Sequence, residues 1–235
     1  MRFLSLDTSS QVGSCALSCH GEMLWRDCPA GRSHSETLLP LVNEMLSEAG
    51  LSLAMLDGIA FGAGPGAFTG LRVACGIAQG LAVVHDLPVL PVSSLAAMAW
   101  AASNSPDHQG EPIISVLDAR MGEVYWGCYQ CRANELLALT AEGVYPPQLL
   151  PLPERGVWVA CGNGLSAYPL IGEHLAPWLV RRQDEILPHA TAVAALAAPA
   201  LARGEGIDAA LAVPVYVRDK VALTTAERLA RGGKA

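Results

Sequence analysis

The sequence contains one pattern twice, roughly 100–110 residues apart, and this repeat limits the folds open to the chain. In the first copy, FLSLDTSSQVGSCALSCHGEMLWRD reads as strand, Asp, short turn, strand, polar turn and strand. The same order appears in IISVLDARMGEVYWGCYQCRANELLAL, and DGIAFGAGPGAF likewise pairs with VWVACGNGLSAY. The repeat predicts a duplicated β-β-β-α-β-α unit, which is an α/β fold with mixed sheets and helices packed on their faces.

We expect the first unit to span residues 1–105 and the second to span 106–235. Runs of apolar residues bounded by turn formers predict strands at 3–7, 13–19, 22–27, 57–62, 88–92, 113–118, 123–131, 135–140, 157–161 and 213–217. Helical spacing predicts helices at 34–49, 70–85, 95–102 and 190–203.

Two such units facing each other resemble the plan of the actin/hexokinase/Hsp70 superfamily, in which the turn after the first strand of each unit faces nucleotide phosphates. An active member usually has Gly soon after the Asp of that turn, so that the backbone can approach phosphate closely. This chain has Ser and Ala there, which predicts a degenerate nucleotide site. The residues that would face the nucleotide are Asp7, Thr8, Ser9, Asp118, Gly162 and Gly164. Asp7 and Asp118 either pair across a cleft or cap the ends of their strands, and both readings stay open here.

The glycine-rich stretch GAGPGAFTGLRV, residues 62–73, looks like a phosphate-binding loop but departs from that pattern. Gly70 is followed by Leu71 where a P-loop has Lys, and no Lys occurs between residues 1 and 213. Its backbone N–H groups can still meet an anion at a helix start, but the side-chain cation of phosphoryl transfer is missing. Thr69 is the expected N-cap of the helix that follows.

The predicted helix 70–85 is apolar nearly all round, which indicates burial on more than one side. Arg72, Gly76 and Gly80 fall on one stripe, four residues apart. Each Gly costs a helix about 1 kcal/mol relative to Ala, so two on one stripe indicate close approach of another helix. That helix belongs either to this chain or to a partner.

Composition narrows the function. Hydrophobic residues make up 51% of the chain and charged residues 16%, which favours apolar surface covered by a partner. The net charge of −7 makes the chain a poor candidate for gripping RNA alone. MRFLSLD reads as a strand rather than an export signal, and no apolar run is long enough for a membrane span, so we expect a cytoplasmic protein.

Neither a metal site nor a catalytic constellation is indicated by the cysteines and histidines. The seven Cys are an odd, scattered set, as in proteins with reduced thiols, and Cys128 and Cys131 fall on opposite faces of a predicted strand. No two of the six His are four residues apart, so none forms the pair that binds metal on one helical face.

Several stretches in a fixed order resemble the TsaB (YeaZ) family: LDTSS, HSETLLPLV, GPGAFTGLRV, PVSSLAAMA and LDARMGEVYW. The resemblance covers most of the chain and is strongest over residues 1–130. It implies a role in forming threonylcarbamoyladenosine at position 37 of tRNAs that read codons beginning with A. In that family the chain is a catalytically inactive relative and scaffold of TsaD, the transferase that carries metal and nucleotide, and the TsaE ATPase joins them.

The resemblance therefore implies no catalytic residue, no metal and no cofactor of this chain's own, and contact with tRNA only through the complex. Because the two proteins share an ancestor, the surface that meets TsaD is expected to pair with itself in a homodimer when TsaD is absent. We expect that interface on helices 34–49 and 70–85, with His34, Leu38, Leu41, Met45, Arg72, Ala74, Gly76, Ile77 and Gly80 in it.

Two other readings stay open. One is a small ATPase or sugar kinase of the same superfamily, and the other is a peptidase-like relative. Residues 217–235 carry an excess of basic side chains in an acidic chain, which indicates either contact with tRNA phosphates or an acidic partner, or else a solvated terminus.

Overall fold

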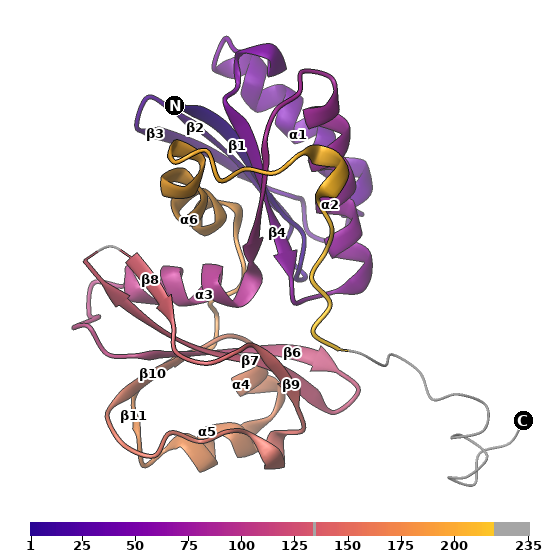
Figure 1. Cartoon of the computed structure of the whole chain (residues 1–235). Coiled ribbons are helices and arrows are strands. Elements are labelled where there is room, and N and C mark those ends of the chain that lie inside the picture. Colours follow the sequence, from indigo (N-terminus) through magenta and orange to yellow (C-terminus); the bar gives the residue numbers. More distant parts are fainter. Residues whose placement is uncertain (134, 219–235) are drawn as a thin grey trace, which may run out of the picture.

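The computed structural model describes residues 1–133 and 135–218, and its helices and sheets alternate in layers (Figure 1). The first unit contains β1 (Arg2–Asp7), β2 (Ser14–Cys19), β3 (Glu22–Asp27), α1 (His34–Glu48), β4 (Gly58–Gly64), α2 (Phe68–Val83), β5 (Val89–Ser93) and α3 (Ser94–Ser103). The second contains β6 (Ile113–Arg120), β7 (Glu123–Arg132), β8 (Glu135–Ala138), β9 (Gly143–Tyr145), β10 (Trp158–Cys161), α4 (Gly164–Ala167), α5 (Pro169–Leu175), β11 (Leu179–Gln183) and α6 (Ala190–Ala202). Short 3₁₀ turns lie at Leu53–Met55, Pro147–Leu149 and Ala209–Leu211.

The two sheets have the same topology. The first runs β3-β2-β1-β4-β5, and the second runs β8-β7-β6-β10-β11, so β6 takes the place of β1. In each sheet the first three strands of the unit pair antiparallel, and the later strands join parallel to the first. The predicted fold class, a duplicated α/β unit on the actin/hexokinase/Hsp70 plan, is therefore confirmed.

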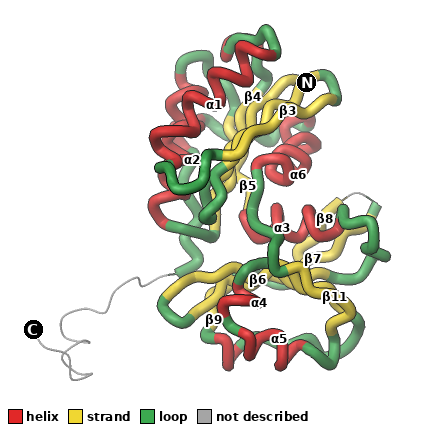
Figure 2. The backbone as a smooth tube through the Cα atoms, turned by 180° about the vertical axis from the view of Figure 1, so that it is seen from behind, coloured by secondary structure: helices red, strands yellow, loops and turns green. Residues whose placement is uncertain are grey.

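Helices α1 and α2 cover one face of the first sheet, and α4 and α5 cover the outer face of the second (Figures 1 and 2). Leu38, Val42 and Met45 of α1 pack with the apolar side chains of β1, β2 and β4 in the first core. Because these three are spaced three and four residues apart, one helical face is buried while the other stays polar.

Two helices are exchanged between the units. α3 ends the first unit but packs on β6 and β7 of the second sheet, whereas α6 lies on β1, β2, β4 and β5 of the first. Ala192, Val193 and Ala197 of α6 meet Phe3 and Ala60 of the first sheet. The Ala-rich sequence of α6 lets it approach the sheet closely, and its packing holds the units together. The division of the chain into two units between residues 105 and 106 stays a prediction, because α3 and α6 each pack on the sheet of the other unit.

Two predictions about elements were wrong, and two strands were not predicted. Residues 213–217 form no strand and follow α2 in extended form, while the edge position beside β10 is taken by β11, which was not predicted. β9 was also missed, because three residues give no periodic pattern. Thr69 is not the N-cap of α2: the helix begins at Phe68 after Ala67, and Thr69 is exposed.

None of the helices in the described part of the chain combines the length and apolar character that crossing a membrane requires.

Candidate functional site

The turn after β1 is held by its own aspartate. Asp7 Oδ1 accepts hydrogen bonds from the Ser9 backbone N–H at 2.9 Å and from Ser9 Oγ at 2.8 Å. This is the capping arrangement that was one of the two readings of Asp7. Asp7 is fully buried, and burial raises its pKa to about 6, although the Ser9 hydrogen bonds and the charge of His189 act in the opposite direction.

The glycine-rich loop after β4 seals this turn. The Ala67 N–H donates to the Ser9 carbonyl at 2.7 Å, and the Thr8 hydroxyl donates to the Gly70 carbonyl at 2.6 Å. A Cβ at Gly70 would overlap the Thr8 carbonyl oxygen, and one at Gly62 would overlap Asp7 Oδ2. The glycines therefore allow two stretches of this chain to touch, which explains a glycine-rich sequence without a phosphate ligand.

The equivalent turn after β6 is open and is held by side chains from elsewhere. Asp118 Oδ1 accepts from the Arg120 N–H at 2.8 Å and from the Tyr168 hydroxyl at 3.3 Å. Arg120 Nη1 lies 3.2 Å from Asp118 Oδ2, with the Arg120 side chain 81% exposed. The Asp118 N–H donates to Asn163 Oδ1 at 3.0 Å. Asn163 was not predicted as a site residue, although its place between Gly162 and Gly164 is the signal that marks it.

Gly162 and Gly164 serve packing. Both are buried against β6, where a Cβ on Gly162 would overlap the Val116 carbonyl oxygen and one on Gly164 would lie 2.7 Å from Val116 Cγ1. Their close approach to β6 places Asn163 within reach of Asp118. The two glycines thus position a side chain, and they do not line the space between the units.

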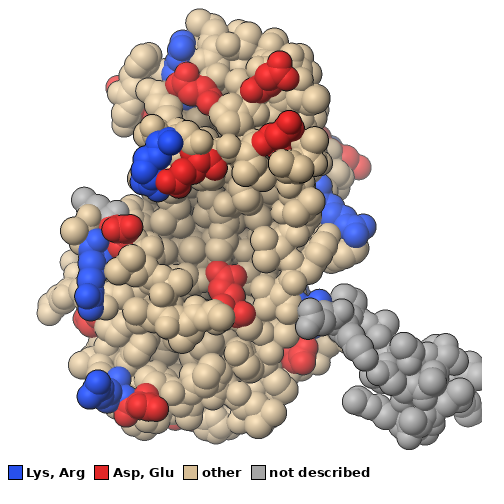
Figure 3. Space-filling model, viewed as in Figure 1, with Lys and Arg blue, Asp and Glu red and all other residues tan. Residues whose placement is uncertain are grey.

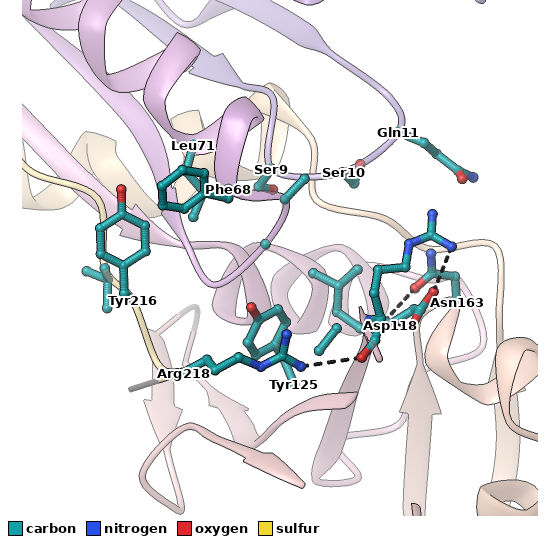
Figure 4. A pocket seen from close by; sticks show the side chains of 16 residues that line it. Ser9, Ser10, Gln11, Phe68, Leu71, Asp118, Tyr125, Asn163, Tyr216 and Arg218 are labelled. Atoms are coloured by element: carbon teal, nitrogen blue, oxygen red, sulfur yellow. Dashed lines mark hydrogen bonds and ion pairs between the residues drawn. The ribbon is translucent and has the colours of Figure 1, made fainter. Parts of the chain in front are cut away.

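A cleft of about 370 Å³ lies between the units, below the start of α2 (Figure 4). The lining residues are Ser9, Ser10, Gln11, Gly66, Ala67, Phe68, Leu71, Leu117, Asp118, Ala119, Arg120, Tyr125, Asn163, Val215, Tyr216 and Arg218. Ser9 and Asp118 are the members of the predicted nucleotide-facing set that reach it. Asp7 and Thr8 are buried behind the loop, so Asp7 and Asp118 do not form a carboxylate pair across the cleft.

Two backbone N–H groups at the first turn are not available to a nucleotide phosphate. The Ser9 N–H donates to Asp7, and the nearby Ala67 N–H donates to the Ser9 carbonyl, so neither faces the cleft as a free donor. A backbone that cradles phosphate needs such groups pointing at the ligand. Over residues 1–133 and 135–218, no three His, Cys, Asp or Glu side chains lie close enough together to hold a metal.

The predicted partner-interface residues divide into three groups, which are buried, half-buried and exposed. Leu38, Met45 and Ala74 are fully buried in the first core, so their side chains are not available to a partner. Leu41 and Ile77 are half-buried against the same core, and His34 is half-buried at the start of α1.

The stripe of Arg72, Gly76 and Gly80 lies on the surface of α2. A Cβ at Gly76 or Gly80 would meet nothing within 4 Å, so within the described residues neither glycine permits a close helix contact. The stripe is extended by apolar side chains at both ends of the helix: Phe68 is 49% exposed, and Val83 and Val84 are each 66% exposed.

Residues 217–235 were predicted as a basic tail, and apart from Val217 and Arg218 they lie outside the described residues. Arg218 does not reach toward solvent: its guanidinium bonds to Glu123 at 2.6 Å.

Comparison with known proteins gave concordant matches. Residues 29–156 match the family model described as "TsaD: tRNA N6-adenosine threonylcarbamoyltransferase". The Escherichia coli "tRNA threonylcarbamoyladenosine biosynthesis protein TsaB" is 37% identical over 94% of this chain and 96% of its own length. A Haemophilus influenzae protein of the same description is 36% identical over 94% and 95%. The solved structure "YeaZ from Pseudomonas aeruginosa" has a TM-score of 0.82 and 41% identity, covering 92% of this chain and 99% of that one.

Proposed function

The chain belongs to the TsaB family and so has a role in threonylcarbamoyladenosine modification of tRNA, and we propose that within this role it is a scaffold without catalysis of its own. Its partner is a TsaD-family transferase, which it activates by binding. The modification is N6-threonylcarbamoyladenosine at position 37 of tRNAs reading codons that begin with A.

The exposed stripe of α2 is the observation that carries this proposal. A helix that places Gly at two surface positions loses stability at both, since each Gly costs about 1 kcal/mol relative to Ala. Gly76 and Gly80 pack against nothing within the described residues, so packing in that part of the chain does not offset this loss. Contact with a partner helix that approaches the α2 backbone closely would offset the stability lost at the two glycines.

The proposed interface combines α2 with its neighbour α1. Contact runs through Arg72, Gly76 and Gly80, with Ile77 and Leu41 at the edges, and His34 lies at the start of α1. Two equivalent helices of the partner would complete a four-helix contact. Leu38, Met45 and Ala74 support this surface from the core, a narrower role than the one predicted for them.

The sealed first turn supports the absence of catalysis by this chain. The turn that would face phosphate in the first unit is hydrogen-bonded to the glycine-rich loop instead. On the face shown in Figure 3, basic side chains are scattered and most lie beside acidic ones, which supports contact with tRNA through the complex. A TsaE-family ATPase as third partner, a homodimer in the absence of TsaD, and a cytoplasmic location complete the proposal.

Light scattering after size-exclusion chromatography tests the interface. The chain alone is expected to elute as a homodimer and to re-sort into a one-to-one complex with the TsaD-family protein from the same source. Gly76→Trp is expected to abolish both, because the indole fills the space a partner helix needs, while the fold is kept. Glu173→Trp, at an exposed position of α5, is the matched control. Association of Gly76→Trp equal to that of wild type would refute the interface.

Nucleotide turnover and tRNA modification test the scaffold role itself. The isolated chain is expected to turn over no nucleotide, whereas modification by the partner in vitro is expected to need this chain. Turnover by the chain alone, abolished by substitutions in the cleft, would favour the kinase or ATPase reading instead.

A further inference from the structure

The segment from Ala209 to Arg218, here called the strap, runs along α2 from Gln79 to Phe68. Gln79 Nε2 donates to the carbonyls of Ala209 at 3.1 Å and Ala212 at 3.0 Å. Further along, the Val215 N–H donates to the Ala63 carbonyl at 2.7 Å. The strap then leaves α2 and reaches the second unit, as the yellow trace in Figure 1 shows. It is thus a connection between the units in addition to the exchanged helices.

The strap meets the proposed interface stripe at Tyr216. The Tyr216 hydroxyl accepts a hydrogen bond from Arg72 Nε at 3.1 Å, and its ring lies 5.5 Å from the Phe68 ring. The Arg72 guanidinium lies 3.9 Å from the centre of the Phe68 ring, a cation–π contact. Tyr216 therefore contacts two exposed residues at the start of α2, and these two also contact each other.

Two residues later, the strap is fastened to the second unit by Arg218. Its Nη2 lies 2.6 Å from Glu123 Oε2 and 3.3 Å from the Arg120 carbonyl. The Arg218 side chain is only 12% exposed, so this ion pair is screened less than a surface pair. Arg218 and Arg120 both line the cleft.

We propose that the strap is a latch that couples the partner-binding face of α2 to the second unit. The inference rests on the proposed function, because it assigns a regulation to that interface. With Arg218 fastened to Glu123, Tyr216 holds Arg72 and Phe68 in the orientation that a partner meets. Release of Arg218 frees Tyr216 and loosens that end of α2. By linkage, partner binding then stabilises the fastened strap to the same extent that the fastened strap strengthens binding.

Partner affinity gives the first test. Arg218→Gln is expected to weaken binding of the TsaD-family protein by about 5- to 10-fold, although Arg218 lies off the α2 stripe. The charge-swapped pair Arg218→Glu with Glu123→Arg is expected to restore affinity. Arg203→Gln, which removes an arginine from an exposed pair with Glu205, is the matched control and is expected to bind like wild type.

Hydrogen exchange of the chain without its partner gives a second, independent readout. In Arg218→Gln the Val215 amide is expected to exchange at least about tenfold faster, together with the amides at the start of α2. Faster exchange in the strap with unchanged exchange over residues 68–72 would overturn the coupling.

The two readouts separate failure of the latch from failure of the proposed function. Wild-type affinity in Arg218→Gln, with binding abolished in Gly76→Trp, would overturn the latch and leave the scaffold function standing. If the partner binds no form of the chain, the scaffold function fails, and the exchange rates alone decide whether the strap holds α2.

Discussion

The turns after β1 and β6 occupy equivalent positions in the two units, yet one is sealed and the other is open. Asp7 is buried under the glycine-rich loop, and within residues 1–133 and 135–218 its side chain accepts hydrogen bonds only from Ser9, two positions along the chain. Asp118 lies at the cleft and is bonded to Arg120, Asn163 and Tyr168. The two turns thus hold the same position in the duplicated fold, but the first is buried under a loop and the second is exposed to the cleft.

The largest effect on stability is expected from a larger side chain at Gly70, where the glycine-rich loop meets the first turn. Gly70→Ala places a Cβ on the Thr8 carbonyl, which the backbone cannot avoid without moving the loop, so we expect a loss of more than about 3 kcal/mol in the free energy of unfolding. Gly76→Ala, in the same helix but in open space, is the control and is expected to gain about 0.5–1 kcal/mol. Urea unfolding measures both, and equal stability of the two variants would show that the loop is not sealed against the turn.

The second-largest effect on stability is expected from the buried carboxylate of Asp7, whose charge destabilises the folded chain. Its pKa is about 6 in the folded chain and 3.8 when unperturbed, so between these values the native state holds a proton that the unfolded state has released. Stability contributed by this group therefore falls as pH rises from 4 to 6 and stays low above that. Asp7→Asn removes this cost and is expected to raise the free energy of unfolding by about 2 kcal/mol at pH 7.

Urea unfolding between pH 4 and pH 8 checks this expectation. The advantage of Asp7→Asn over wild type is expected to vanish near pH 4, where Asp7 is protonated in the folded chain. If the stability advantage of Asp7→Asn does not change with pH, its cause is packing and not charge. The two turns would then not differ in the cost of burying a charge.

The open turn is expected to depend on Asn163 by a smaller amount. Asn163→Ala removes the acceptor of the Asp118 N–H, and we expect a loss of about 1 kcal/mol, because the group is only partly buried and water can replace the bond. Thermal unfolding measures it. A loss as large as that of Gly70→Ala would mean that the second turn is as tightly built as the first.

The smallest effect is expected for Asp118→Asn. Its partner Arg120 is 81% exposed, and exposed ion pairs contribute less than about 1 kcal/mol. The shift is expected to shrink further in 0.5 M salt, measured by the same unfolding experiment, because salt screens exposed charges. If salt does not alter the change in stability, the hydrogen bonds of Asp118 contribute more to stability than its charge does.

Much of the fold could be predicted because it repeats. The strand, Asp and turn pattern around Asp7 and Asp118 identified both units, and helical spacing located α1 and α2 within two residues at each end. The strap was beyond sequence reasoning, since VPVYV has strand character and only its neighbours show that it follows a helix. Periodic patterns report a local preference, whereas the partner of an extended segment is a tertiary property.

The site was harder to predict for a related reason. Spacing placed Leu38 and Gly76 on the surface of the same helix pair, but spacing does not say which face meets the sheet, and Leu38 is in the core. The role of Asn163 was overlooked because the glycines on either side of it suggested a nucleotide-binding loop, whereas its side chain binds the Asp118 N–H. In both cases the missing information was what lies opposite the residue.

The exchange of α3 and α6 sets the order in which the protein can mature on the ribosome. The inner face of the first sheet, with Phe3 and Ala60, is only partly covered by Ala97 of α3, and the rest of its cover comes from α6, which ends at Ala202. Nearly the whole chain must therefore be synthesised before the first unit can close, although its strands are made first. A nascent chain stalled between the units would present an apolar sheet face to the cell, so translation pauses there would favour chaperone capture or aggregation.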